Sequence, residues 1–193
     1  MKARLEELLR QFASRDSATR ESAAHEIFDL GCASAAQAIE PWLADAELSS
    51  LLGTPPQATV GVAVHPSRFR EIREAHGSTR LADVPPDHDA LEFELHFANA
   101  ARLDVLTTRD PAGSGAIAGF LRKLGEGVQQ VEFRCRDVDR ATQILGEKFA
   151  VRAIYPAARP GADATRVNFF LVSSSSGQKI LVELYQPSSA GNP

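Results

Sequence analysis

The stretch Gly125-Glu-Gly-Val-Gln-Gln-Val-Glu-Phe133 decides how this chain is organised. Gly125 closes an apolar helical segment, and the alternation of apolar and polar residues after it is typical of a strand with one buried face. The next run, Val138–Phe149, has helical spacing, and Asp137 before it is a suitable N-cap. Three more strands are expected at 151–155, 165–172 and 179–185, the last two joined through Ser173–Gly177.

A strand, a helix and further strands also follow one another about 70 residues earlier in the chain. A strand, a short helix, two further strands and a second helix are expected at Thr59–Val64, Pro66–His76, Leu91–Phe97, Arg102–Leu106 and Ser114–Leu124. This internal repeat predicts an α+β fold over residues 59–187, in which two βαβββ modules form one cupped mixed sheet. The small and polar residues 188–193 are expected to be a tail.

The first 53 residues have helical rather than alternating periodicity. Leu5, Leu8, Leu9 and Phe12 repeat at helical spacing. A second helix is expected from Ala18 to Leu30, ended by Gly31 as a C′ glycine, and a third from 33 to 46 with Pro41 inside it. We interpret residues 1–53 as a separate helical module that resembles one HEAT-type helix pair. The segment 53–57, rich in Pro and Gly, is the expected boundary.

Composition narrows the class of protein. The 193 residues are 44% hydrophobic, with a formal net charge of −4 and a pI of about 5.7, which argues against a nucleic-acid or anionic-membrane surface. There is no apolar run of transmembrane length and no apolar signal core near the N-terminus. The two cysteines, Cys32 and Cys135, lack metal-ligand spacing and are expected to be buried thiols in a reducing compartment, the cytoplasm.

Strand alternation predicts a polar sheet face. Each module's helix must cover the apolar set of side chains, so the opposite set faces away from it. This polar face is either simply solvated or a concave pocket for a small ligand, and its crowded carboxylates favour the pocket because they need a compensating cation, proton or metal. The expected members are Thr59, Gly61, Ala63, Glu92, Glu94, His96, Arg102, Asp104, Gln130, Glu132, Arg134, Arg166, Asn168, Lys179, Leu181, Glu183 and Tyr185.

Several motifs, taken in order, resemble one known superfamily. The motifs are Thr59–Val64, Gly125–Phe133, Asp137–Asp139, Arg159–Gly161, Arg166–Phe170 and Ile180–Leu184. They resemble the vicinal-oxygen-chelate superfamily over about residues 59–187, with methylmalonyl-CoA epimerase as the nearest member by eye. Glyoxalase I and the bleomycin-resistance proteins are more distant.

The resemblance implies a divalent metal in the cup, held by one residue from each of four strands. The matching positions here are Thr59, Asp104, Gln130 and Glu183. The two histidines of the epimerase ligand set are replaced by Thr59 and Gln130, which leaves Asp104, Gln130 and Glu183 as the candidate metal ligands. Losing imidazoles weakens a site for a first-row transition metal, so a bound metal is possible but not the favoured expectation.

The resemblance also implies an acid/base pair for proton abstraction next to a carbonyl, at Glu92 and Glu183. The other predicted pocket residues are Thr59, Glu94, His96, Asp104, Gln130, Arg134, Asn168 and Tyr185. His96 is either a replacement ligand or base, or a histidine paired with a neighbouring carboxylate.

Three functions therefore remain open. The first is an isomerase or lyase of the epimerase type. The second is a metal-free protein that binds a small ligand. The third is an interaction protein that uses its helical arm. A homodimer is a further expectation, because this fold commonly pairs its modules or chains.

Overall fold

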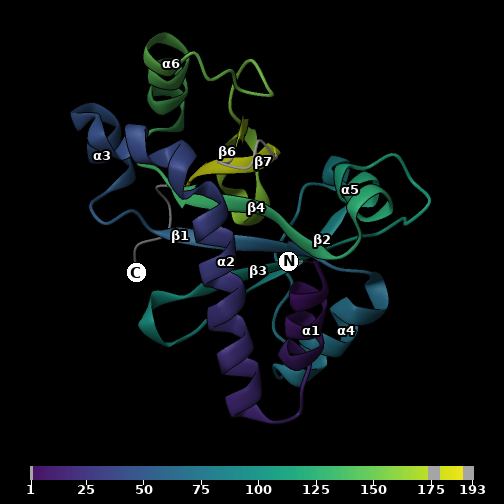
Figure 1. The fold of residues 1–193 in the computed structure, drawn as a ribbon. Coiled ribbons are helices and arrows are strands. Elements are labelled where there is room, and N and C mark those ends of the chain that lie inside the picture. The colour runs from purple at the N-terminus through teal and green to yellow at the C-terminus, as the bar shows by residue number, and fades with distance from the viewer. Residues whose placement is uncertain (1, 174–178, 189–193) are drawn as a thin grey trace. The chain divides into compact units, whose positions relative to one another are not determined.

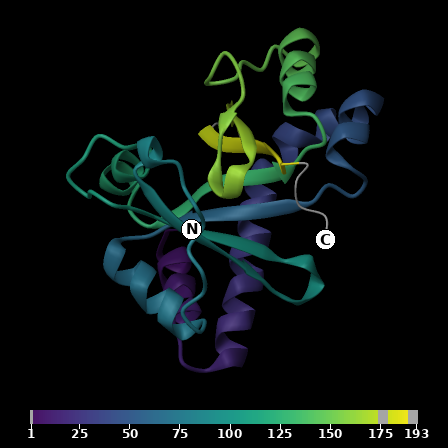
Figure 2. The ribbon, with the colours of Figure 1, turned by 180° about the vertical axis from the view of Figure 1, so that it is seen from behind.

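The computed structural model describes residues 2–173 and 179–188, drawn as a ribbon in Figures 1 and 2. Most of the predicted hairpin loop at 173–177 and of the predicted tail lies outside the described residues. The chain divides into two compact units, neither continuous in sequence. The first combines the residues up to Gly31 with Thr59–Gln129, and the second combines Cys32–Ala58 with the described residues from Gln130 onward. The boundary near residue 53 stays a prediction.

The first unit holds three strands in the order β2-β3-β1. β1 is parallel to β3, with Val60 opposite Leu103, and β2 is antiparallel to β3, with Phe93 opposite Val105. The elements of this unit are α1 (Lys2–Phe12), the first part of α2 (Ser17–Ala44), β1 (Ala58–Ala63), α4 (Pro66–Ala75), β2 (Ala90–His96), β3 (Arg102–Thr108) and α5 (Ala116–Leu124). Short 3₁₀ turns lie at Pro86–His88 and Ala98–Ala100.

Aromatic side chains hold the first unit together. Helices α1 and α4 lie side by side in both views (Figures 1 and 2), and the rings of Phe12 and His76 are 4.8 Å apart. Phe69 on α4 meets Phe93 on β2 edge to face at 4.9 Å. These helices therefore cover the apolar face of β2-β3-β1, as the strand alternation requires.

Helix α2 runs without interruption from Ser17 to Ala44, so the predicted helix end at Gly31 is wrong. Gly31 is needed for close packing instead: a Cβ atom there would lie 2.4 Å from Cγ1 of Val60. Pro41 lies inside the helix and does not end it. A further short helix, α3 (Ala46–Leu52), follows, with Asp45 as the N-cap that accepts from the backbone N–H groups of residues 47 and 48.

The second unit holds four strands in the order β4-β7-β6-β5. β4 is parallel to β7, and β6 is antiparallel to both β7 and β5. The strand predicted at 151–155 is wrong, because the described chain makes only a single bridge there, between Ala153 and Phe170. The elements are β4 (Gly127–Arg134), α6 (Val138–Phe149), β5 (Arg159–Pro160), a 3₁₀ turn (Ala162–Ala164), β6 (Arg166–Ser173) and β7 (Lys179–Gln186).

The core of the second unit lies between its sheet and α6, α3 and the end of α2. Trp42 and Phe170 meet edge to face at 6.3 Å within it. The Asp137 side chain accepts from the backbone N–H of Arg140, so the predicted N-cap of α6 is confirmed. The Lys148 ammonium lies 2.8 Å from the Asp45 carboxylate and ties α6 to the start of α3.

The predicted fold class, α+β with a repeated strand–helix–strand order, is confirmed. The first module contributes three strands and the second contributes four. Among the helices in the described part of the chain, none combines the length and the apolar character that a membrane span requires.

Candidate functional site

The residues predicted for the polar face of the first unit lie on β1, β2 and β3. The register places Asp104 between Gly61 of β1 and Glu94 of β2. Thr59 and Asp104 are buried, with 2% and 7% of their surface exposed, and Glu92 is half-buried. Thr59, Glu92, Glu94, His96 and Asp104 therefore all belong to one unit.

The outer end of this face is an exposed ion-pair cluster. Nε2 of His96 lies 2.9 Å from a carboxylate oxygen of Glu94, and an Arg102 guanidinium nitrogen lies 3.9 Å from the same oxygen. The side chains of His96 and Glu94 are 61% and 43% exposed. Of the two readings of His96, this geometry favours the histidine paired with a carboxylate, since exposed pairs of this kind are common on solvated faces.

The second unit contains a buried amide–carboxylate pair. Nε2 of Gln130 on β4 donates to Oε2 of Glu183 on β7 at 2.8 Å and to Oε1 of Glu132 at 3.0 Å. Gln130 is 6% exposed and Glu183 is 9% exposed. The parallel pairing of β4 and β7 sets Glu132 opposite Glu183, so the two carboxylates share the donors of one amide. Burying a carboxylate is costly unless it is hydrogen-bonded, and Gln130 supplies a bond.

The predicted place of Asn168 on the polar face is wrong. Its side chain is fully buried on the opposite face, where Nδ2 donates to the Tyr155 carbonyl at 3.3 Å and lies 3.5 Å from the Thr142 hydroxyl of α6. Oδ1 accepts from the backbone N–H of Phe169 at 2.9 Å. Local partners thus satisfy this buried amide, which lets the only polar residue of the run 167–172 face the helix.

Because Asn168 faces the helix, its two neighbours in the alternation of β6 face the opposite way, and apolar residues therefore lie on the polar face. Phe169 lies opposite Glu183, and Leu171 lies opposite Leu181. Phe169 meets the Tyr155 ring edge to face at 6.1 Å, and the Arg159 guanidinium stacks over Tyr155 at 4.6 Å. Gln130 and Glu183 therefore have an apolar and aromatic wall. The sequence does not predict this wall, because residues on both faces of β6 are apolar. Only the antiparallel register with β7 shows which β6 residues lie on which face of the sheet.

Tyr185 is also on this face, opposite Arg134 of β4 and Val167 of β6. Its hydroxyl accepts from Nε2 of Gln57 at 3.3 Å. No local pattern marks Gln57 as a residue of this face, because its closeness to Tyr185 depends on a contact across 128 residues of chain.

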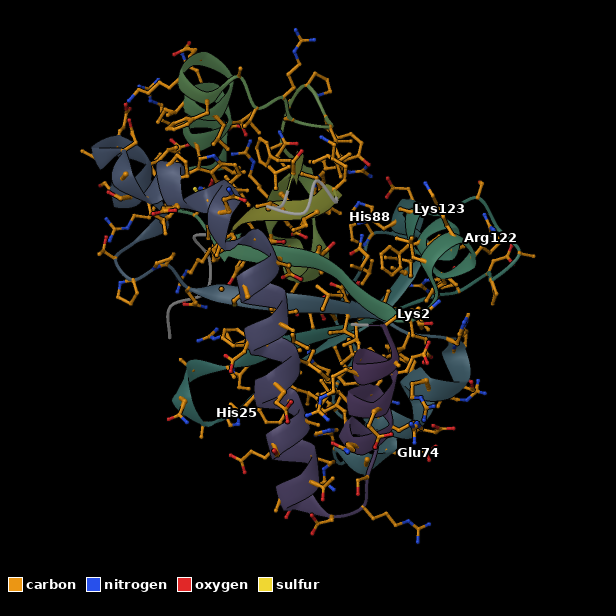
Figure 3. All side chains as sticks on the ribbon, in the orientation of Figure 1. Lys2, His25, Glu74, His88, Arg122 and Lys123 are labelled. Atoms are coloured by element: carbon orange, nitrogen blue, oxygen red, sulfur yellow. The ribbon has the colours of Figure 1, made fainter. Side chains whose placement is uncertain are left out.

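The helical region offers little apolar surface for a partner. Of the large hydrophobic residues that are exposed in the described chain, only Leu30 belongs to α1, α2 or α3. His25, labelled on α2 in Figure 3, lies 2.9 Å from the Ala98 carbonyl of its own unit. The described residues of these helices thus lack the exposed apolar patch that an interaction protein of this kind would be expected to have.

The residues at the implied metal positions do not fit a transition-metal centre. The Gln130 amide nitrogen donates to Glu183, so this amide is already the partner of that carboxylate, and its oxygen is only a weak neutral donor to a cation. No imidazole stands at the four matching positions, where the chain has Thr59, Asp104, Gln130 and Glu183. The part of the chain that the structure describes contains no group of three or more His, Cys, Asp or Glu side chains suited to a metal ion.

Comparison with solved structures identifies the relatives of this chain. The methylmalonyl-CoA epimerase of Mycobacterium tuberculosis is 30% identical over 67% of this chain and 86% of its own, with a TM-score of 0.55. The chain belongs to the vicinal-oxygen-chelate superfamily, as a relative of methylmalonyl-CoA epimerase. No family model and no curated protein matches the sequence.

Two further structures share the fold of this superfamily. A methylmalonyl-CoA epimerase solved with methylmalonyl-CoA and NH₄⁺ is 22% identical, covering 70% of this chain and 96% of its own, with a TM-score of 0.55. A hypothetical protein from Bacillus halodurans C-125 is 20% identical over the same shares, with a TM-score of 0.57. The glyoxalase-like fold predicted from the sequence is thus confirmed.

Proposed function

We propose that this protein binds a small carbonyl compound of the acyl-thioester class, and that it does so without a transition metal. The carrying observation is the hydrogen bond of 2.8 Å between the buried Gln130 amide and the Glu183 carboxylate. The ligand class comes from the relatives, one of which was solved with methylmalonyl-CoA. In this proposal the amide replaces a metal as the partner of the carboxylate.

The buried pair of Gln130 and Glu183 fits a ligand-binding role better than a purely structural role. A buried carboxylate beside Phe169 and Leu181 costs desolvation energy that an apolar residue at position 183 would avoid. The apolar wall accommodates the uncharged part of the ligand.

Calorimetric titration of chelator-treated protein with methylmalonyl-CoA tests this proposal. We expect binding in the presence of the chelator, weakened at least about tenfold by Glu183→Gln or Gln130→Ala, because each removes one side of the buried pair. The matched control is Glu94→Gln, which removes an exposed carboxylate and is expected to leave binding unchanged. Absence of binding, or binding that requires added metal, would contradict the proposal.

An epimerase-type isomerase is the second candidate, favoured by the retained Glu183 carboxylate. In this reading Glu183 accepts the proton next to the thioester carbonyl, and Glu92 is the predicted partner base. Proton NMR of methylmalonyl-CoA in D₂O checks it: an enzyme exchanges the α-proton at a rate that Glu183→Gln abolishes. If the protein binds methylmalonyl-CoA but the α-proton exchanges no faster than in buffer, the isomerase function is contradicted and only the binding function stands.

A further inference from the structure

A recess of about 350 Å³ in the second unit lies beside the polar face. It is lined by Leu51, Leu52, Gly53, Pro55, Gln57, Arg134, Cys135 and Arg136. No carboxylate is among these residues, and its two charged side chains are both guanidinium groups. The recess therefore has a formal charge of +2.

Backbone hydrogen bonds fix the walls of this recess. The N–H of Arg134 donates to the Gln57 carbonyl at 3.1 Å, and the N–H of Arg136 donates to the Leu51 carbonyl at 3.0 Å. Between them, Cys135 donates its N–H to the Tyr185 carbonyl at 2.7 Å. The segment 51–57 is thereby held against 134–136, so both arginines start from a pre-organised backbone.

The two guanidinium groups differ from those of Arg140 and Arg166 in the same unit. Arg140 pairs with Glu47, and Arg166 lies 2.7 Å from the Asp139 carboxylate. Within the described residues neither Arg134 nor Arg136 has an ion pair or a side-chain hydrogen bond. Burial raises the pKa of the nearby Cys135 thiol to about 11, so that side chain adds no negative charge at neutral pH. No group of the recess neutralises the two arginines.

We propose that this recess binds a phosphate or pyrophosphate group. Two guanidinium forks can bind several oxygens of one phosphate at once, and the volume exceeds what a lone carboxylate needs. Arg134 is on the same strand face as Gln130, at a distance of about 13 Å at a rise of roughly 3.3 Å per residue. This part of the proposal rests on the proposed function: one elongated ligand contacts Gln130 and Glu183 with its carbonyl end and occupies the recess with its phosphate end.

Calorimetric titration of the full chain with inorganic pyrophosphate at low ionic strength tests the site. We expect binding to the wild type that weakens at least about tenfold in Arg134→Gln/Arg136→Gln and weakens with added salt. Arg15→Gln/Arg152→Gln removes the same charge from exposed arginines outside the recess and is expected to keep full affinity. No binding, or the same loss in both double variants, would overturn the proposal, and thermal unfolding checks that each variant is folded.

Two further measurements test the phosphate site independently of the proposed function. Gln130→Ala is expected to keep pyrophosphate binding while it weakens methylmalonyl-CoA binding, so the two proposals can fail independently. Displacement of pyrophosphate by methylmalonyl-CoA would show that both groups belong to one ligand. Simultaneous binding of both would overturn the single-ligand reading and assign the recess to a free phosphate compound.

Discussion

The two units carry polar sheet faces that look alike in sequence and differ in environment. In the first, Glu94 and His96 pair with each other on an exposed strand end, with Arg102 close by. In the second, Gln130 and Glu183 pair while buried, beside an apolar wall. The alternation of residues is the same in both, so alternation alone does not distinguish a solvated face from a binding site. Burial and the partner residue make the distinction.

The largest expected loss of stability comes from a pair of variants that test which face of β6 belongs to the core. Phe170→Ala should cost about 3–5 kcal/mol of unfolding free energy, because it removes a fully buried ring that packs on Trp42. Phe169→Ala is the matched variant and should cost clearly less, since Phe169 is only half-buried on the opposite face. Urea denaturation measures both. Equal losses would contradict the assignment of the two faces.

A smaller effect compares the two polar pairs directly. Gln130→Ala should destabilise the protein by about 1–3 kcal/mol, because a buried carboxylate then loses a hydrogen-bond donor. His96→Ala should change stability by no more than roughly 0.5 kcal/mol, because its partner Glu94 stays solvated. If the histidine variant proved the more damaging of the two, the contrast between the faces would be wrong.

The smallest effect concerns a histidine of the first unit, His76. Burial lowers the pKa of His76 below the ordinary 6.5, although its hydrogen bond to the Phe12 carbonyl acts in the opposite direction. Below pH 6.5 the unfolded chain then binds a proton that the folded chain resists, so stability falls as the pH falls. We expect melting temperatures of the wild type, measured between pH 8 and 5, to fall in this way.

The variant His76→Phe keeps an aromatic ring against Phe12 and Phe97. It should show a smaller fall in melting temperature over the same pH range, because the titrating group is gone. A slope as steep as that of the wild type would mean that other groups cause the pH dependence.

The sequence predicted most of the fold because its signals are local. The strand alternation in 59–64, 91–97, 128–136 and 179–185, and the Asp137 cap, depend on neighbouring residues, and the structure has strands over most of each range and the cap. The helix end predicted at Gly31 is wrong because a glycine that ends a helix and a glycine that allows the close approach of Val60 look the same in sequence. The difference lies in a residue 29 positions away.

The candidate site was predictable in part. Alternation placed Gln130, Glu132, Arg134, Glu183 and Tyr185 on one face, and the register of β4 with β7 agrees. The phase of β6 was not predictable, since five of the six residues from 167 to 172 are apolar and offer no preference between faces. The recess at Arg134 and Arg136 was missed because its other wall, 51–57, comes from far along the chain.

The most direct test of the central claim is a calorimetric titration of chelator-stripped protein with Co²⁺, Ni²⁺, Mn²⁺ and Zn²⁺, with Glu183→Ala alongside. We predict no binding of these ions that depends on Glu183, because the Gln130 amide already serves as the partner of that carboxylate. Micromolar binding to the wild type that disappears in Glu183→Ala would contradict the claim and restore a metal to the site.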